Sequence, residues 1–342
     1  MHSQNSIVKK ILIFLILAIV IISVSIGYRS ITLGEGVLEV KGGFIRENNV
    51  IWSKSPSVML NINNNSILPK KIEIIVLNIK KGSILQSKDK DKLINPNEKI
   101  VLSLPPLSKN SYVIKLPDAN TLRFAVVGDS RQDSSKDPYP RVFKKIMEDI
   151  DSKNVNFVMH VGDFVIHEEE KYFEEFEDIM EDYDTPVYTV IGNHDSDIQN
   201  GSLYKEYYGD TFYSFMYMDT KFIILDDSTE LLNQENISFL ENELKYDGEK
   251  LVFLHVPPFD PRPSGSHNME GGEEFMQIMK DNNISNVFSG NVHMYYQTII
   301  DNTRYIITGG GGSPLHTTEE NGGFHHYVIY NQGGIQLINM DD

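Results

Sequence analysis

The sequence predicts an α/β domain built on a sheet, preceded by a small all-β domain and an N-terminal apolar helix. Residues 11–28 carry no charge, and short Val/Ile/Leu-rich runs separated by turn residues follow as far as residue 118. From residue 121, strand-like runs alternate with segments of helical spacing, a pattern typical of α/β domains. The expected boundaries are 1–30 for the membrane segment, 31–118 for a β-sandwich and 119–342 for the α/β domain.

The composition limits the class of protein. The chain has 342 residues and a formal net charge of −17, with 40% hydrophobic and 23% charged residues, which is typical of a folded globular chain. Because a surface this acidic repels phosphate backbones, we do not expect a nucleic-acid partner. The absence of cysteine excludes disulfide bonds, thiolate metal ligands and a cysteine nucleophile.

The N-terminal run Ile11–Tyr28 is uncharged and follows two lysines. As a helix it would span about 27 Å, close to the apolar thickness of a bilayer. The preceding lysines favour a cytoplasmic start, which would leave the chain after Arg29 outside the cytoplasm. We expect a single-pass membrane anchor; secretion after signal cleavage is the alternative, because small residues stand near the end of the run, at Ser23, Ser25 and Gly27.

The second segment shows only strand signals. The four clearest runs are SVMLNIN at 57–63, IEIIVLNIK at 72–80, KIVLSLP at 99–105 and SYVIKLP at 111–117. Short strands at this spacing predict a β-sandwich of immunoglobulin or fibronectin type. Because the segment has no concentration of His, Asp or Glu, we expect a spacer or docking module, with Trp52 in its core.

The third segment alternates strands with helices. The helices are expected at 139–150, with Val142, Ile146 and Ile150 on one face, at 171–184, around residues 237–244 and at 273–280. The strands are expected at 122–127, 156–161, 187–191, 212–226 as a hairpin, 251–254, 286–289, 298–308 as a pair and 325–338 as a pair.

Polar residues follow five of these apolar runs directly. Because ligands of open α/β sheets bind at the carboxyl ends of strands, we expect the side chains to converge. Carboxylate and amide oxygens and imidazole nitrogens are the ligands that one or two divalent cations need. The sequence therefore predicts a metal centre formed by the residues after these runs, which are Asp129, Asp163, Asn193-His194-Asp195, His255 and Asn291-Val292-His293.

The order D…GD…GNHD…HxPP…GxxH resembles the calcineurin-like metallophosphoesterase superfamily from Thr121 to the C-terminus, and TGGGGSPL at 308–315 is also typical of it. The resemblance implies a four-layer α/β/β/α sandwich with two divalent metal ions (Mn, Fe, Zn or Mg) at the rim of its sheets. It also implies that a metal-bound hydroxide hydrolyses a phosphate mono- or diester substrate.

The resemblance assigns the ligands residue by residue. Asp129 and His293 would hold the first metal, and Asp163 would bridge the two ions. Asn193 and His255 would hold the second metal.

It also assigns the acid–base residues. His194 would stabilise the developing charge or protonate the leaving oxygen, and Asp195 would orient its imidazole.

Two positions depart from the family pattern, and each removes one imidazole. Arg131 stands at the third position of the D-x-H block, and Asn291 replaces the first histidine of G-H-x-H. Asn291 still offers an amide oxygen to a metal. Since a guanidinium has no acceptor, Arg131 cannot be a ligand, and we hypothesise that it binds a phosphoryl oxygen of the substrate.

Two other functions compete with this one. The degraded ligand set would fit a non-catalytic binding module at the cell surface. The Gly-Asp-Ser stretch would fit a GDS-type serine esterase that uses Ser130, but the D-x-x-H that such enzymes need occurs nowhere in the chain.

Further polar residues have ordinary structural interpretations. We expect His160 to be packed in a strand, His167 to lie in a loop and Asp226 and Asp227 to form a turn, while His316 could line a cleft.

Overall fold

The computed structural model describes residues 29–33, 36–46, 49–88 and 90–341. The predicted membrane anchor, residues 11–28, lies outside the described residues. Within the described ranges, no helix combines the length and the apolar character needed to cross a bilayer.

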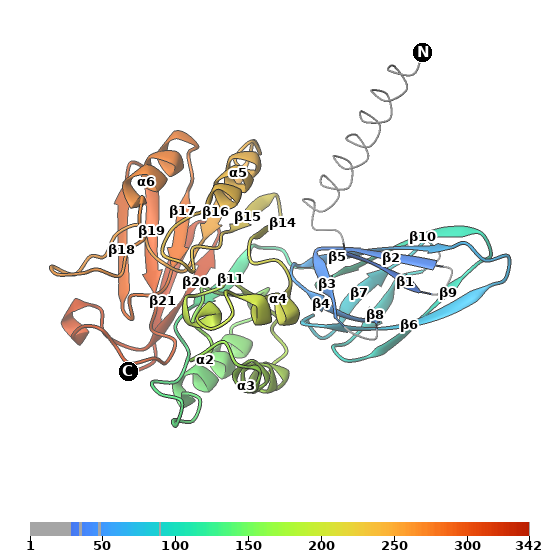
Figure 1. The fold of residues 1–342 in the computed structure, drawn as a ribbon, viewed down its shortest axis with the longest axis horizontal. Helices are drawn as coiled ribbons and strands as arrows, with labels where there is room; N and C mark the ends of the chain where they lie inside the picture. Colours follow the sequence, from blue (N-terminus) through green and yellow to red (C-terminus); the bar gives the residue numbers. More distant parts are fainter. Residues whose placement is uncertain (1–28, 34–35, 47–48, 89, 342) are drawn as a thin grey trace, which may run out of the picture.

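The N-terminal part consists of two sheets packed face to face (Figure 1). One has the strand order β1-β2-β5-β10-β7-β8 and the other β3-β4-β6-β9. Alternate residues point inward, as in β9, where Ile100, Leu102 and Leu104 are buried. The strands are β1 Arg29–Leu33, β2 Gly36–Lys41, β3 Gly43–Ile45, β4 Val50–Ser53, β5 Ser57–Asn64, β6 Lys70–Leu77, β7 Ser83–Gln86, β8 Lys92–Ile94, β9 Lys99–Leu104 and β10 Ser108–Lys115.

The C-terminal part has two further sheets. The first has the order β13-β12-β11-β20-β21, with β11, β12 and β13 parallel, and the second β14-β15-β16-β17-β19-β18. Their strands are β11 Arg123–Val127, β12 Val158–His160, β13 Val187–Thr189, β14 Tyr213–Tyr217, β15 Thr220–Ile224, β16 Glu249–Phe253, β17 Asn286–Ser289, β18 Tyr295–Ile300, β19 Thr303–Thr308, β20 His326–Asn331 and β21 Gly334–Asn339.

Helices cover the outer faces of these two sheets (Figure 1). An aromatic cluster that includes Phe124, Phe222 and Phe253 fills the space between the sheets. On the first sheet lie α2 Arg141–Ser152 and α3 Glu170–Glu181, and on the second lie α5 Gln234–Glu243 and α6 Gly272–Asp281. The layers therefore follow the order α/β/β/α, with the short helix α4 Ser202–Tyr208 beside α3.

Polar contacts join the N-terminal sheets to the rest of the chain. The Asn78 side chain donates to the Val187 carbonyl at 2.7 Å and accepts from its N–H at 2.8 Å. This pairing satisfies the backbone of β13 at the edge of its sheet, where unpaired groups would otherwise face solvent. Arg46 Nη1 forms an ion pair with Glu177 of α3 at 3.0 Å, and its Nε donates to the Tyr207 carbonyl at 2.8 Å.

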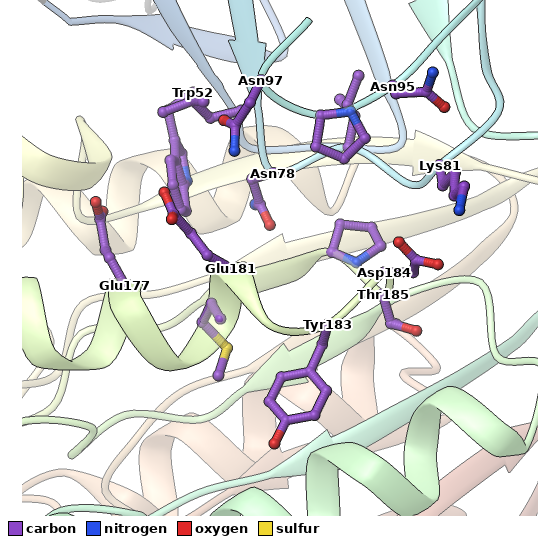
Figure 2. A pocket seen from close by; sticks show the side chains of 15 residues that line it. Trp52, Asn78, Lys81, Asn95, Asn97, Glu177, Glu181, Tyr183, Asp184 and Thr185 are labelled. Atoms are coloured by element: carbon purple, nitrogen blue, oxygen red, sulfur yellow. The ribbon is translucent and has the colours of Figure 1, made fainter.

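Trp52 lies at this junction and not, as expected, in the core of the N-terminal sheets. Its ring contacts Tyr208 at 5.3 Å between centroids, and the Arg46 guanidinium lies 4.2 Å from the ring centroid. A cavity of about 300 Å³ flanks the contact, and Figure 2 shows Trp52 and Asn78 opposite Glu177 and Glu181 of α3. The N-terminal sheets therefore pack on the α/β part through both apolar and charged groups.

Candidate metal centre

The structure brings the sequence-predicted residues to one edge of the two inner sheets. Asp129, Asp163 and Asn193 follow the parallel strands β11, β12 and β13, whereas His255 and His293 follow the parallel strands β16 and β17. Asp129, Asp163, His255 and His293 are each no more than 3% exposed, and Asn193 is half-buried.

The loops that carry these residues have unusual backbone conformations. Asp129 and Asp163 have φ values of 58° and 56°, a left-handed region that costs free energy for residues other than glycine. The Asp129 N–H donates to the Gly162 carbonyl at 3.0 Å, which holds the two loops together. Gly192 leaves room for the second carboxylate, since a Cβ there would lie 2.3 Å from Asp163 Oδ1.

One group of possible ligands consists of Asp129, Asp163 and His293. One ligand atom from each lies within 4.8 Å of the others, and His293 Nε2 is 3.3 Å from Asp129 Oδ1. His293 Nδ1 donates to the Pro314 carbonyl, so Nε2 presents its lone pair to the carboxylates. These are the three residues that the resemblance assigns to the first metal site.

The second group lies on the other side of Asp163. His255 Nε2 is 3.3 Å from Asp163 Oδ1 and 3.0 Å from Asn193 Oδ1, and its Nδ1 donates to the Val161 carbonyl at 2.8 Å. Three acceptor atoms therefore face one another, an arrangement that requires a proton or a cation between them. A divalent cation fits this set of two oxygens and one imidazole nitrogen.

Electrostatics keep the shared carboxylate ionised. Burial alone would raise the pKa of Asp163, but His255, His194 and Arg131 outweigh it and lower the pKa to about 2. Burial likewise would lower the pKa of His255, yet the nearby carboxylates, Asp163 foremost, raise it to about 9. In the absence of metal a proton therefore sits where a cation would bind, so cation binding displaces that proton.

The Nε2 atom of His194 faces the centre. Its Nδ1 donates to the Ile166 carbonyl at 2.9 Å, and its Nε2 lies 3.9 Å from Asp163 Oδ2. The imidazole is thus fixed by a backbone carbonyl, with Nε2 available to a substrate.

The predicted role of Asp195 was wrong. The carboxylate does not orient His194, because it is fully buried and its oxygens accept four backbone N–H groups. It therefore links the loop that follows β12 to the loop that follows β13. The four donors, at 2.7–3.1 Å, are Gly192, Asp163, Phe164 and Val165.

The two departures from the family pattern make contacts of their own. Arg131 Nε lies 3.3 Å from Asp163 Oδ2, and its Nη1 donates to the Gln132 carbonyl at 3.0 Å. Asn291 donates its backbone N–H to Asp129 Oδ2 at 3.0 Å and its side-chain Nδ2 to the His267 carbonyl at 3.1 Å. Asn291 thus orients the Asp129 carboxylate through its main chain, and its role as a metal ligand stays a prediction.

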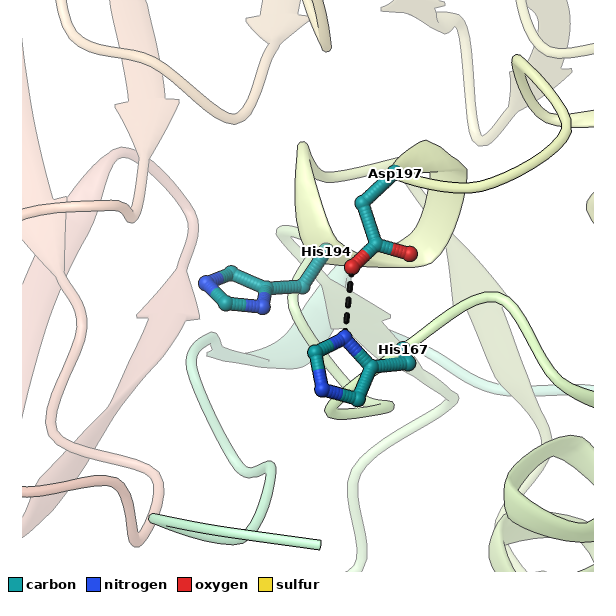
Figure 3. A group of neighbouring side chains, drawn as sticks. All are labelled: His167, His194 and Asp197. Carbon is teal, nitrogen blue, oxygen red and sulfur yellow. Dashed lines mark hydrogen bonds and ion pairs between the residues drawn. The ribbon is translucent and has the colours of Figure 1, made fainter.

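A second group of metal-binding residue types consists of His167, His194 and Asp197 (Figure 3). His167 Nδ1 donates to Asp197 Oδ2 at 2.6 Å, and the Nδ1 of His194 is already engaged with the Ile166 carbonyl. With these nitrogens engaged, only the Nε2 atoms could offer a lone pair to a cation. Within the group, His167 and Asp197 form a hydrogen-bonded His–carboxylate pair beside His194.

Sequence reasoning missed one residue that shapes the centre and indicated another. Asp227, expected in a simple turn, is buried and accepts the N–H groups of His255 and Val256 at 2.8 and 2.9 Å. The signal in the sequence that could have indicated this role of Asp227 was its position just after the apolar run FIIL. His316, which the sequence indicated could line a cleft, stacks on His293 at 3.9 Å between ring centroids and lines a cavity of about 870 Å³ beside the centre.

Ser130 is not accessible as a nucleophile. It is fully buried, and its hydroxyl is hydrogen-bonded to His160 Nε2 at 2.9 Å and to the Tyr139 hydroxyl at 2.7 Å. Burial lowers the pKa of His160 to about 3, so this histidine is neutral, as expected for a packed residue. An ester substrate could not reach this hydroxyl, which contradicts the serine-esterase alternative.

Solved structures share this fold. The purple acid phosphatase PPD1 from yellow lupin (Lupinus luteus) seeds is 12% identical and aligns over 89% of this chain and 72% of its own, with a TM-score of 0.59. GAP50, the anchor in the inner membrane complex of Plasmodium, is 17% identical over 65% of this chain and 85% of its own, with a TM-score of 0.51. No curated protein matches the sequence.

The family model of the calcineurin-like phosphoesterases matches residues 122–295, which is half of the chain and includes every residue of the centre. The match agrees with the expectation from the motif order and with the four layers. The chain belongs to the calcineurin-like phosphoesterase family and is a hydrolase of phosphoric esters.

Proposed function

We propose that the protein hydrolyses phosphate mono- or diesters at the centre formed by Asp129, Asp163, Asn193, His255 and His293. The observation that carries the proposal is the position of Asp163, whose carboxylate lies between the ligand groups of His293 and His255. Divalent cations bound there supply Lewis acidity and acidify coordinated water.

Side chains beside the cation ligands supply the other parts of the proposed reaction. His194 Nε2, held by the Ile166 carbonyl, is placed to give a proton to the leaving oxygen. Arg131, whose side chain is 13% exposed, keeps guanidinium N–H groups available for a phosphoryl oxygen of the substrate. The adjoining cavity of about 870 Å³ offers space for the alcohol part of the ester.

Hydrolysis of p-nitrophenyl phosphate and bis(p-nitrophenyl) phosphate by the purified full-length chain in Mn²⁺ tests the proposal. We expect turnover of at least one substrate and a loss of more than about a hundredfold in Asp163→Asn, because even outer-shell partners of metal ligands contribute up to that factor. Asp247→Asn, an exposed site, is the matched control. No turnover in the unmodified chain would contradict the proposal and favour a non-catalytic binding module.

We also propose that residues 11–28 anchor the chain in a membrane with the centre on the outer side. The uncharged run and the preceding lysines support it. We expect the chain to stay in membranes after carbonate extraction. We also expect the folded part to be open to added protease in intact cells. A mature N-terminus after residue 28 would show secretion after cleavage instead.

A further inference from the structure

The two oxygens of the Asp163 carboxylate have different partners. Oδ1 faces His255 Nε2 at 3.3 Å, next to Asn193 Oδ1, whereas Oδ2 faces Arg131 Nε at 3.3 Å. A carboxylate that bridges two cations would give each ion a share of its negative charge. Here one side is open to a cation and the other side already holds one, the guanidinium.

The guanidinium is a fixed part of the site. Its Nη1 donates to the Gln132 carbonyl, and only 13% of the Arg131 side chain is exposed. A guanidinium does not lose its proton, so its charge cannot be removed to admit a metal ion. A divalent cation bound beside it would experience repulsion at a few ångströms, in a place where water screens poorly.

The opposite side has no such obstacle. Among the described residues, no Lys or Arg side chain other than Arg131 forms an ion pair with Asp129 or Asp163. Asp163 Oδ1, Asn193 Oδ1 and His255 Nε2 converge on one point, and both His255 and Asp163 are fixed by hydrogen bonds from neighbouring loops.

We propose that Arg131 takes the place of the first divalent cation, so that the centre binds one cation tightly, at Asp163, Asn193 and His255. Binding at Asp129 and His293 is correspondingly weak. The inference deepens the proposed function and rests on the same centre, but it concerns the number of cations and not turnover.

Manganese binding tests the inference on the purified full-length chain. Bound Mn²⁺ is counted after dialysis by elemental analysis, and its environment is read by EPR, which distinguishes an isolated ion from an exchange-coupled pair. We expect one Mn²⁺ per chain with the signal of an isolated ion. Asn193→Ala should lose this tight ion, whereas His293→Ala should keep it.

Two substitutions of Arg131 separate lost repulsion from a gained ligand. Arg131→Met removes the charge without adding a ligand and should tighten the second Mn²⁺ at least about tenfold, a change of about 1.4 kcal/mol. Arg131→His adds an imidazole and should give two ions per chain with a coupled signal. Arg141→His, at an exposed position on α2, is the matched control and should leave the count at one.

Two equally tight ions in the unmodified chain would overturn the inference, and so would a second-ion affinity that Arg131→Met leaves unchanged. Loss of the tight ion in His293→Ala but not in Asn193→Ala would also overturn it. Turnover with two tight ions would leave the proposed function intact. One tight ion without turnover would support the inference and contradict the proposed function.

Discussion

The distance from Nε2 to the nearest carboxylate oxygen separates His194 from the other imidazoles of the centre. His255 and His293 turn Nε2 toward the ligand groups, and His194 turns Nε2 toward the outer oxygen of Asp163, at 3.9 Å. At this distance from the Asp163 carboxylate, Nε2 is placed for the role that we propose for it, which is to give a proton to the leaving oxygen.

Replacement of His194 by alanine should therefore slow the hydrolysis of esters with poor leaving groups most. An alkyl ester needs its leaving oxygen protonated, whereas p-nitrophenolate leaves unaided, so we expect a loss of about 10²–10⁴-fold for the former only. The ratio of kcat/KM between the two substrates is the measurement. His325→Gln, in the surface pair with Asp341, is the control. Equal losses on both substrates would contradict the role of proton donor.

Asp195 should behave as a structural residue. An asparagine offers one acceptor oxygen, and its NH₂ group would meet backbone donors, so Asp195→Asn should lower the free energy of unfolding by about 1–3 kcal/mol. Urea unfolding measures the loss. If Asp195 instead oriented His194, the variant would keep its stability and change the leaving-group ratio.

At the scale of the elements, the hydrophobic pattern predicted most of the α/β strands and helices. In the N-terminal sheets it missed β1 and β2, and also β3, β4, β7 and β8. The last four have three or four residues each, too few to show alternation, and are defined by distant partners. In α2 the pattern indicated Val142, but the sheet buries Phe143 and Met147 together with Ile146 and Ile150. Packing against the sheet therefore determines which edge of the apolar stripe of the helix is buried, and the helical pattern alone does not.

Asn78 should stabilise the contact between the N-terminal sheets and β13. Asn78→Ala removes both hydrogen bonds to Val187 and leaves the strand edge unpaired, so we expect a loss of about 1–3 kcal/mol. Faster hydrogen exchange at the Val187 amide is the measurement, and Asn65→Ala, at an exposed position, is the control. Unchanged exchange would show that the contact does not protect this edge.

At the scale of the whole molecule, the N-terminal sheets and the α/β part contact each other through fixed groups. Arg46 pairs with Glu177, Lys54 Nζ donates to the Asp210 carbonyl at 2.6 Å, and Trp52 packs on Tyr208. These contacts fix the N-terminal sheets to the α/β part, and their role as a spacer or docking module stays a prediction.

Divalent cations should stabilise the entire fold, because the centre joins loops from both inner sheets. At a Mn²⁺ concentration about a hundred times the Kd, one tight site contributes about 2.7 kcal/mol. The Tm should therefore rise with Mn²⁺ and fall on addition of EDTA, as followed by thermal unfolding. The Tm of Asp163→Asn should change little with Mn²⁺. If its Tm rose as much as that of the unmodified chain, the stabilising cation would bind elsewhere.

The sequence by itself determined which residues form the centre, because each stands directly after an apolar run whose burial carries it to the same sheet edge. Which atom faces which partner was decided only by the tertiary structure. Asp195 binds backbone amides and Arg131 lies against Asp163 because segments about thirty residues apart meet there with left-handed turns. Local sequence patterns do not predict such long-range contacts, since loop conformation depends on packing between elements distant in the chain.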